Sequence, residues 1–270
     1  MLKELFRFER DKYFHSSRMI LPLILLFFYL GFAYSMAPQY VLDSFSICSL
    51  VVFLLMLSVG IMYDDINYPM IDQTIFIKTE KKEQIFGARC VLIAYISFGA
   101  SAACVVYPVL VDLAGRGNLF MRPLRPEDLV SAFFLFWLIG ICGGVTGLFA
   151  NSRLFKKREA ALLLGALLGL VIILKGPIGE EFPPTRLLTW ILPPVYDLSV
   201  NYCKEDYFSL SANGIYFLWL AGYTGIEIFL YIWMMKRKKF EKEHFGNNEW
   251  KKSLYQRGMN RGTGSLCTVY

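Results

Sequence analysis

The chain has 270 residues, of which 56% are hydrophobic and 19% charged, and its mean hydropathy is +0.44. Soluble domains contain about 45–50% apolar and about 25% charged residues, so the composition argues against an ordinary water-soluble protein. The formal net charge of +6 does not indicate nucleic-acid binding, because the basic residues lie between apolar blocks and at the chain ends, where membrane topology requires them.

The first residues of the chain predict a helix that lies in the cytoplasmic membrane interface. Within residues 2–15, Leu2, Leu5, Phe6 and Tyr13 fall near one helical stripe, with basic residues beside it. A disordered basic leader is the alternative.

Six apolar blocks follow, and crossing the ~30 Å hydrocarbon core of a membrane takes about 20 residues. We therefore predict an all-α polytopic membrane protein. Residues 1–245 form a single transmembrane domain, and residues 246–270 a flexible tail. The fifth block is short, and Lys175 is expected to extend from it to the membrane surface. The spans run approximately over residues 19–36, 45–63, 90–111, 129–150, 160–174 and 212–235.

The distribution of lysine and arginine gives the orientation. These residues gather before the first span, after the second, after the fourth and after the sixth. The positive-inside rule therefore places both termini in the cytoplasm, as an even number of spans requires. The long outer connection, 175–211, contains an apolar patch at 187–195 that is too short to cross. This patch predicts a short helix or a re-entrant hairpin.

Motifs for catalysis are missing from the sequence. There is no GxxxxGK[ST] loop, so the chain has no P-loop ATPase site, and no hydrolase or metal-binding motif occurs. Glu180-Glu181 and Arg186 resemble the motif of intramembrane CAAX-type proteases, but the arginine falls one residue late and later spans lack histidine. We interpret the pair as a solvated acidic turn. No catalytic, cofactor-binding or metal-binding residue is predicted.

Glu227 is the one carboxylate well inside a predicted span. Its burial in a membrane costs about 2.5–3.5 kcal/mol on insertion scales, so it is expected to face protein or water. One interpretation places Glu227, with Tyr223 one turn earlier, on a substrate path. The other is a structural hydrogen bond to a neighbouring helix, for which Thr146 offers a hydroxyl.

Small residues predict close helix packing in the fourth and fifth spans. Residues three or four apart that lack bulky side chains let helix backbones approach. We expect this packing within one subunit, and contact between two subunits is the alternative. The glycines are Gly140, Gly143, Gly144, Gly147, Gly165 and Gly169.

The connection between the second and third spans is longer than a simple turn requires. Pro69 and the acidic pair before it end the second span, and apolar residues then recur at helical spacing between residues 70 and 77. This pattern predicts a short amphipathic helix at the cytoplasmic surface, followed by the charged run 78–83.

These features resemble the ABC-2 type permease family. Its members have an acidic residue at the end of the second span, a short helix, a threonine-containing turn and a basic residue that opens the third span. Here these correspond to Asp64 or Asp65, residues 72–77, Thr79 and Arg89.

The match departs from the family pattern where Pro69 and Met70 stand near the expected Gly-Thr, and where Thr79 lacks a following proline. The resemblance covers residues 1–245 and implies a non-catalytic permease subunit of an exporter. It also implies that the short helix couples the permease to an ATPase; a helix that merely rests on lipid head groups is the alternative. The implied coupling residues are Asp72, Gln73, Thr74, Ile75, Phe76, Ile77, Lys78 and Thr79.

The family resemblance further implies the partners. Two permease subunits, identical or different, would bind two copies of an ABC ATPase, which hold ATP and Mg2+, in a bacterial cytoplasmic membrane. In its small size the chain resembles permeases that export amphipathic peptides, such as bacteriocins, lantibiotics or peptide toxins. Permeases that export drugs are similar. An ATP-independent secondary carrier or a membrane scaffold protein is the alternative.

Overall fold

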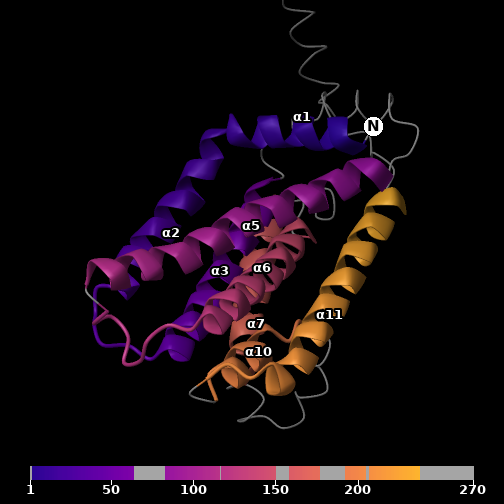
Figure 1. Cartoon of the computed structure of the whole chain (residues 1–270). Helices are drawn as coiled ribbons and strands as arrows, with labels where there is room; N and C mark the ends of the chain where they lie inside the picture. The colour runs from indigo at the N-terminus through magenta and orange to yellow at the C-terminus, as the bar shows by residue number, and fades with distance from the viewer. Residues whose placement is uncertain are drawn as a thin grey trace, which may run out of the picture. The chain divides into compact units, whose positions relative to one another are not determined.

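The computed structural model describes residues 2–63, 83–115, 117–149, 158–176, 192–204 and 207–237. In these ranges the chain is almost entirely helical, and an isolated bridge joins Gln39 to Phe120 (Figure 1). The all-α fold class is therefore confirmed for the described part. The chain divides into two units, Met1–Met235 and Lys236–Tyr270, and the first contains nearly all of the described residues.

Four of the described helices are long and apolar enough to cross a membrane. They match the second, third, fourth and sixth predicted spans. The third begins earlier than predicted, at Glu83, because an acidic side chain in the first turn suits the positive end of the helix dipole. The four are α3 (Val41–Tyr63), α5 (Glu83–Ala114), α6 (Pro126–Phe149) and α11 (Leu210–Arg237).

Two shorter apolar helices lie at the first and fifth predicted spans. The 14 residues of α2 (Ile20–Ala33), which follows the 3-10 helix η1 (Ser17–Met19), extend only about 21 Å, less than the ~30 Å hydrocarbon core. The second is α7 (Arg158–Ile173), whose apolar part is Leu163–Ile173. The count of six spans therefore stays a prediction.

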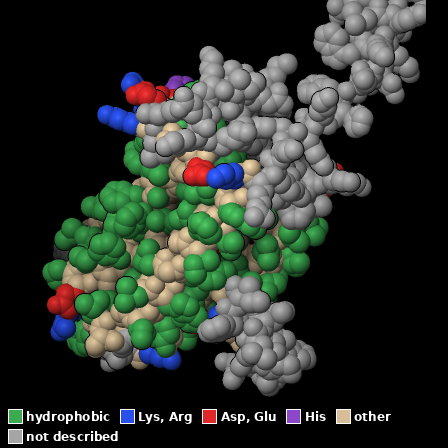
Figure 2. Space-filling view, turned by 90° about the vertical axis from the view of Figure 1, so that its right-hand side faces the viewer, with side chains coloured by type: hydrophobic (Ala, Val, Ile, Leu, Met, Phe, Trp, Pro, Cys, Tyr) green, Lys and Arg blue, Asp and Glu red, His purple; other side chains and the backbone are tan. Residues whose placement is uncertain are grey.

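The outward surface of these helices is apolar. Phe28 on α2 is 74% exposed and Leu218 on α11 is 75% exposed. Figure 2 shows hydrophobic side chains over much of one face, with charged side chains mainly toward its upper and lower ends. Water-soluble proteins rarely expose apolar patches this extensive, so this surface indicates a membrane protein.

The centre of the unit is the contact between α3 and α6. A side chain at Gly60 of α3 would meet the carbonyl oxygen of Gly144 on α6, and a Cβ at Gly143 would lie 2.5 Å from the carbonyl oxygen of Phe53. The two backbones therefore touch without intervening side chains. The prediction that the glycines pack within one subunit is confirmed at these positions, and a side chain at Gly169 of α7 would likewise meet Leu57 of α3.

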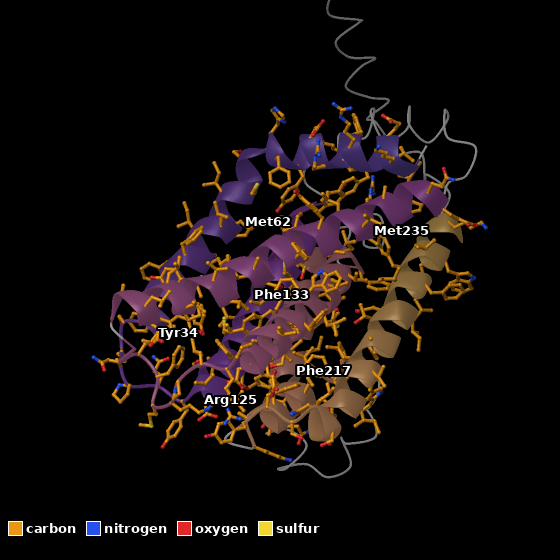
Figure 3. The ribbon with its side chains drawn as sticks, viewed as in Figure 1. Tyr34, Met62, Arg125, Phe133, Phe217 and Met235 are labelled. Atoms are coloured by element: carbon orange, nitrogen blue, oxygen red, sulfur yellow. The ribbon has the colours of Figure 1, made fainter. Side chains whose placement is uncertain are left out.

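The predicted N-terminal helix is present as α1 (Leu2–Phe14). Figure 1 shows it lying across one end of the helices, and Figure 3 places Met62 and Met235 toward that end and Arg125 toward the other. Part of the predicted stripe packs on protein, since the Phe6 ring lies 5.9 Å from that of Tyr95 on α5. Its position in a membrane interface stays a prediction.

The connection 175–211 contains α10 (Val195–Tyr202), which begins directly after two prolines. Most of the apolar patch at 187–195 lies outside the described residues. Ser46 of α3 donates a hydrogen bond to the Ser199 carbonyl at 2.7 Å, so α10 is fixed to a spanning helix. The expectation that Lys175 extends to the membrane surface stays a prediction. Lys175 is 8% exposed and pairs with Asp197 of α10 at 2.6 Å, because a nearby carboxylate satisfies its charge.

Candidate functional site

Glu227 lies on the face of α11 that is turned toward α6. It is 8% exposed. The Thr146 hydroxyl donates a hydrogen bond to Oε1 of Glu227 at 2.6 Å, and the Cys142 thiol lies 3.5 Å from Oε2. Since Thr146 and Cys142 are one turn apart, one stretch of α6 meets both carboxylate oxygens.

The Thr146 hydroxyl has two acceptors but a single hydrogen. Its oxygen also lies 2.9 Å from the carbonyl oxygen of Cys142. When the hydroxyl donates to this carbonyl, a close contact with Glu227 requires a proton on the Glu227 carboxyl group. Rotation of the Thr146 hydroxyl therefore lets the site hold Glu227 either as a carboxylate or as a protonated carboxyl group.

This geometry contains the contact that the structural interpretation of Glu227 requires, namely a hydrogen bond to Thr146. Tyr223 lies one turn before Glu227 on α11 and is half-buried. The two residues therefore share a helix face. A role for either in a substrate path stays a prediction.

A second polar cluster, which the sequence did not predict as a site, joins α1 to α3 and α5. Glu9 of α1 is 2% exposed and accepts hydrogen bonds from the Tyr63 hydroxyl at Oε2 and from Arg89 Nε at Oε1, the latter over 3.3 Å. Lys12 Nζ lies 3.6 Å from Oε2. We call Glu9, Lys12, Tyr63 and Arg89 the α1 clamp.

Aromatic rings enclose the α1 clamp. The Arg89 guanidinium carbon lies 5.7 Å from the centroid of the Tyr63 ring and 5.7 Å from that of Phe86. The Tyr13 ring stacks on Tyr63 at 6.3 Å. Because both side chains are 2% exposed, the Coulomb attraction between Glu9 and Arg89 is stronger than at the surface, and an unpaired charge here would be costly.

The α1 clamp sits at both ends of the connection between α3 and α5. Tyr63 is the last described residue before residues 64–82, and Arg89 lies in the second turn of the helix that follows them. The predicted coupling residues, Asp72–Thr79, lie outside the described residues. Glu9 of α1 is therefore hydrogen-bonded to a residue on each of the two helices that this connection joins.

One signal in the sequence could have identified the α1 clamp. Glu9 and Tyr13 are four residues apart, so they share a helix face with the apolar stripe of α1. A carboxylate on a stripe that packs against protein needs a buried cation. Arg89, the basic residue at the start of the third predicted span, is such a cation.

The opposite end of the unit carries a separate ion pair. Arg122 Nη1 donates to Asp128 Oδ2 at 2.6 Å, and the backbone amide of Arg125 donates to the same oxygen at 3.2 Å. The hydrogen bond to Asp128 raises the pKa of Arg122 above its ordinary value. The guanidinium carbons of Arg122 and Arg125 lie 4.6 and 4.0 Å from the centroid of the Tyr207 ring. This cluster holds the start of α6 to the connection 175–211.

In the parts of the chain that the structure describes, no group of three or more His, Cys, Asp or Glu side chains is arranged to hold a metal ion. No known protein-family model matches the chain, and no curated protein matches it.

Proposed function

We propose that this chain is the membrane permease subunit of an ABC exporter, of the ABC-2 type, and that a separate ATPase subunit drives it. The described structure has four helices that are long and apolar enough to span a membrane, and two shorter apolar helices. These helices provide the framework for such a subunit. The observation that carries the proposal is the α1 clamp.

A coupling segment must pass a movement of the ATPase to the spanning helices. Residues 64–82 run from the end of α3 to the start of α5, and Glu9 binds Tyr63 on the first and Arg89 on the second. A displacement of this connection therefore moves α1, α3 and α5 together, because breaking a buried ion pair costs several kcal/mol. Packed elements that move as rigid bodies are a common means of transmitting such changes.

In the proposed assembly, Asp72–Thr79 contact the ATPase, which binds ATP and Mg2+. Two permease subunits face each other in the bacterial cytoplasmic membrane, with both termini in the cytoplasm. The cargo is an amphipathic peptide or a drug that moves past Glu227 and Tyr223. The buried Glu227 carboxylate supports this path, since ionisable groups inside membranes commonly mark routes of transport.

Co-purification tests the proposal. The tagged chain, extracted in mild detergent from the cells that naturally make it, is expected to bring down an ATPase with a P-loop. Replacing Ile75 and Phe76 by aspartate should abolish this association and leave the amount of chain in the membrane unchanged. Tyr40→Asp is the control, because Tyr40 is exposed and lies outside the connection.

Three outcomes would count against the proposal. If no ATPase accompanies the unmodified chain, and the Ile75 and Phe76 variants support transport normally, the coupling assignment is wrong. Transport in vesicles that persists without ATP, and depends on an ion gradient, would instead support a secondary carrier. A chain that binds partners but moves no solute would support a scaffold.

A further inference from the structure

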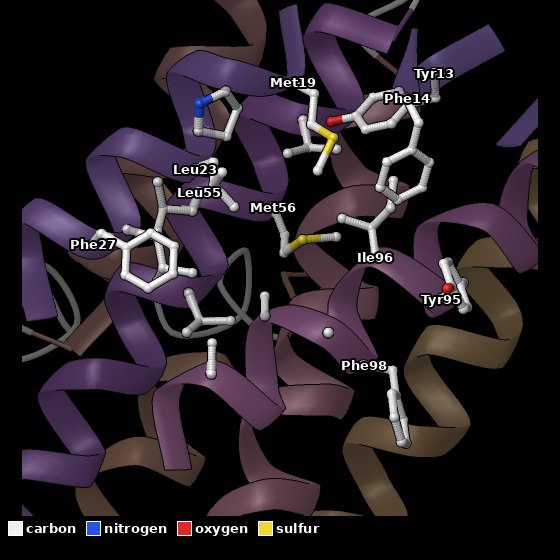
Figure 4. Close-up of a pocket in the computed structure, with 17 residues that line it drawn as sticks. Tyr13, Phe14, Met19, Leu23, Phe27, Leu55, Met56, Tyr95, Ile96 and Phe98 are labelled. Carbon is white, nitrogen blue, oxygen red and sulfur yellow. The ribbon is translucent and has the colours of Figure 1, made fainter. Parts of the chain in front are cut away.

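An apolar groove of about 410 Å3 opens between α2 and α5, with α3 at its floor and the end of α1 and η1 closing it (Figure 4). Ligand pockets commonly have volumes of about 300–1,000 Å3. The groove is lined almost entirely by aliphatic and aromatic side chains, among them Met19, Leu55, Met56 and Ile96. Glu227 and Tyr223 are not among its lining residues, so it is separate from the predicted substrate path.

The groove opens on the outer surface of the apolar helices α2 and α5. Leu23 and Phe27 of α2 are 42% and 51% exposed, and Phe98 of α5 is 49% exposed. Figure 4 shows Phe27 and Phe98 on opposite sides of the groove. On a helix that spans a membrane, such side chains contact lipid, so the groove is accessible to a hydrocarbon chain from the side.

A missing side chain helps to form the hollow. Gly99 lines the groove, and a Cβ added there would meet no atom within 4 Å. This glycine differs from those between α3 and α6, which allow close backbone contact. The space beside Gly99 is open in the described part of the chain.

The N-terminal segment, whose residues Tyr13, Phe14 and Met19 border one end of the groove, carries a net positive charge. The first 18 residues contain five lysines and arginines and three acidic residues. Of the acidic residues, Glu9 is bound by Arg89 and Lys12, and Asp11 is paired with Arg10 at 2.8 Å. The net charge beside this end favours an anionic head group, because basic segments next to a membrane attract anionic lipids.

From these observations we propose that the groove binds one acyl chain of an anionic membrane phospholipid, with the phosphate head group beside α1 and η1. The lipid fills the space between α2 and α5 and stabilises the short helix α2 against the bundle. This inference does not depend on the proposed ABC exporter function.

Photocrosslinking tests the proposal directly. The full chain is reconstituted in phosphatidylcholine bilayers with a small fraction of phosphatidylglycerol that carries a photoreactive diazirine on one acyl chain. After irradiation, mass spectrometry is expected to find crosslinks concentrated in the parts of α2, α3 and α5 that line the groove. Crosslinks spread evenly over all lipid-facing helices would overturn the proposal, whether or not any variant folds.

Two glycine variants provide a matched comparison. Gly99→Phe fills the groove and should cause the loss of these crosslinks. Gly222→Phe adds the same ring to α11, where a Cβ also meets no atom within 4 Å, and should leave them unchanged. Added phosphatidylglycerol should raise the melting temperature of the unmodified chain and of Gly222→Phe, but not that of Gly99→Phe. Equal responses of the two variants would contradict the proposal.

Competition identifies the occupant. Unlabelled phosphatidylglycerol should displace the probe more effectively than unlabelled phosphatidylcholine, and equal displacement would overturn the assignment of an anionic head group. Crosslinks that join two copies of the chain through the groove would show that a protein surface occupies it in place of lipid.

Discussion

Arg89 on α5 donates a hydrogen bond from Nε to Oε1 of Glu9 on α1 over 3.3 Å, and each of the two side chains is 2% exposed. Such a pair need not stabilise a fold more than apolar residues of the same volume would. Its consequence is specific: the pair favours this docked position of α1, because a shifted helix would separate Glu9 from Arg89 and leave the buried guanidinium unpaired.

The first prediction concerns this pair. Glu9→Ala should lower the free energy of unfolding by about 3–5 kcal/mol, because Arg89 loses its buried partner. Asp11→Ala removes an exposed ion pair with Arg10 and should cost less than about 1 kcal/mol. Thermal unfolding of the purified chain in detergent measures both. A double variant, Glu9→Leu with Arg89→Met, should recover much of the loss; failure to recover would show that the charge pair itself is required.

The second prediction concerns the contact of α3 and α6. Gly60→Val should destabilise the fold by at least about 1–3 kcal/mol, because the new side chain meets the backbone of Gly144 and forces the helices apart. Gly225→Val on α11 is the control, since a Cβ there meets no atom within 4 Å. The melting temperatures of the two variants in the same detergent compare the effects. Equal melting temperatures would contradict the close backbone contact.

The third prediction separates the two interpretations of Glu227. Glu227→Gln retains an acceptor for the Thr146 hydroxyl but removes the titratable group, so transport should fall more than the folded yield. Thr146→Val removes the donor and leaves the buried carboxylate less well satisfied, so it should reduce the folded yield as well. Size-exclusion chromatography measures the folded yield, and an assay in vesicles measures transport. Parallel loss of both quantities in Glu227→Gln would favour a purely structural role.

The fourth prediction concerns alkaline pH. Burial raises the pKa of Tyr13 from 10.0 to about 12, because the folded chain disfavours the phenolate. Since the pKa is higher in the folded state, the associated stability is complete below about pH 10 and falls as the pH rises to about 12, by about 1.4 kcal/mol per pH unit. Tyr13→Phe should therefore lose less stability than the unmodified chain between pH 10 and 12.

Melting temperatures at several pH values test this difference. Tyr40→Phe provides the comparison, because Tyr40 is 60% exposed in the folded chain whereas Tyr13 is buried. If Tyr13→Phe and Tyr40→Phe follow the same pH dependence, Tyr13 does not contribute in this way.

Features that depend on local sequence could be predicted. The long apolar blocks at α3, α5, α6 and α11 were recognisable because a membrane-spanning helix needs a continuous run of apolar residues. The packing of Gly143 and Gly144 was recognisable because small residues at helical spacing define a contact surface without reference to the partner.

Features that depend on a distant partner could not be predicted in the same way. Glu9 shares a helix face with Tyr13, but the partners that its burial requires, Arg89 and Tyr63, lie far along the chain on other helices. The pairing of Lys175 could not be predicted for the same reason, because its partner Asp197 lies on a different helix. The length of an apolar block likewise does not determine the length of its helix, as α2 shows.

The direct contact of backbones at Gly60 and Gly144 restricts the motions available to the molecule. Neither α3 nor α6 can turn about its own axis without bringing a bulkier residue into the contact, since packed interiors resist such intrusion. By contrast, α11 meets its neighbours through long side chains, such as Tyr231 against Phe86 and Phe149, which can change rotamer. We therefore expect α3 and α6 to move as one body in any conformational change, with α11 tilting against them.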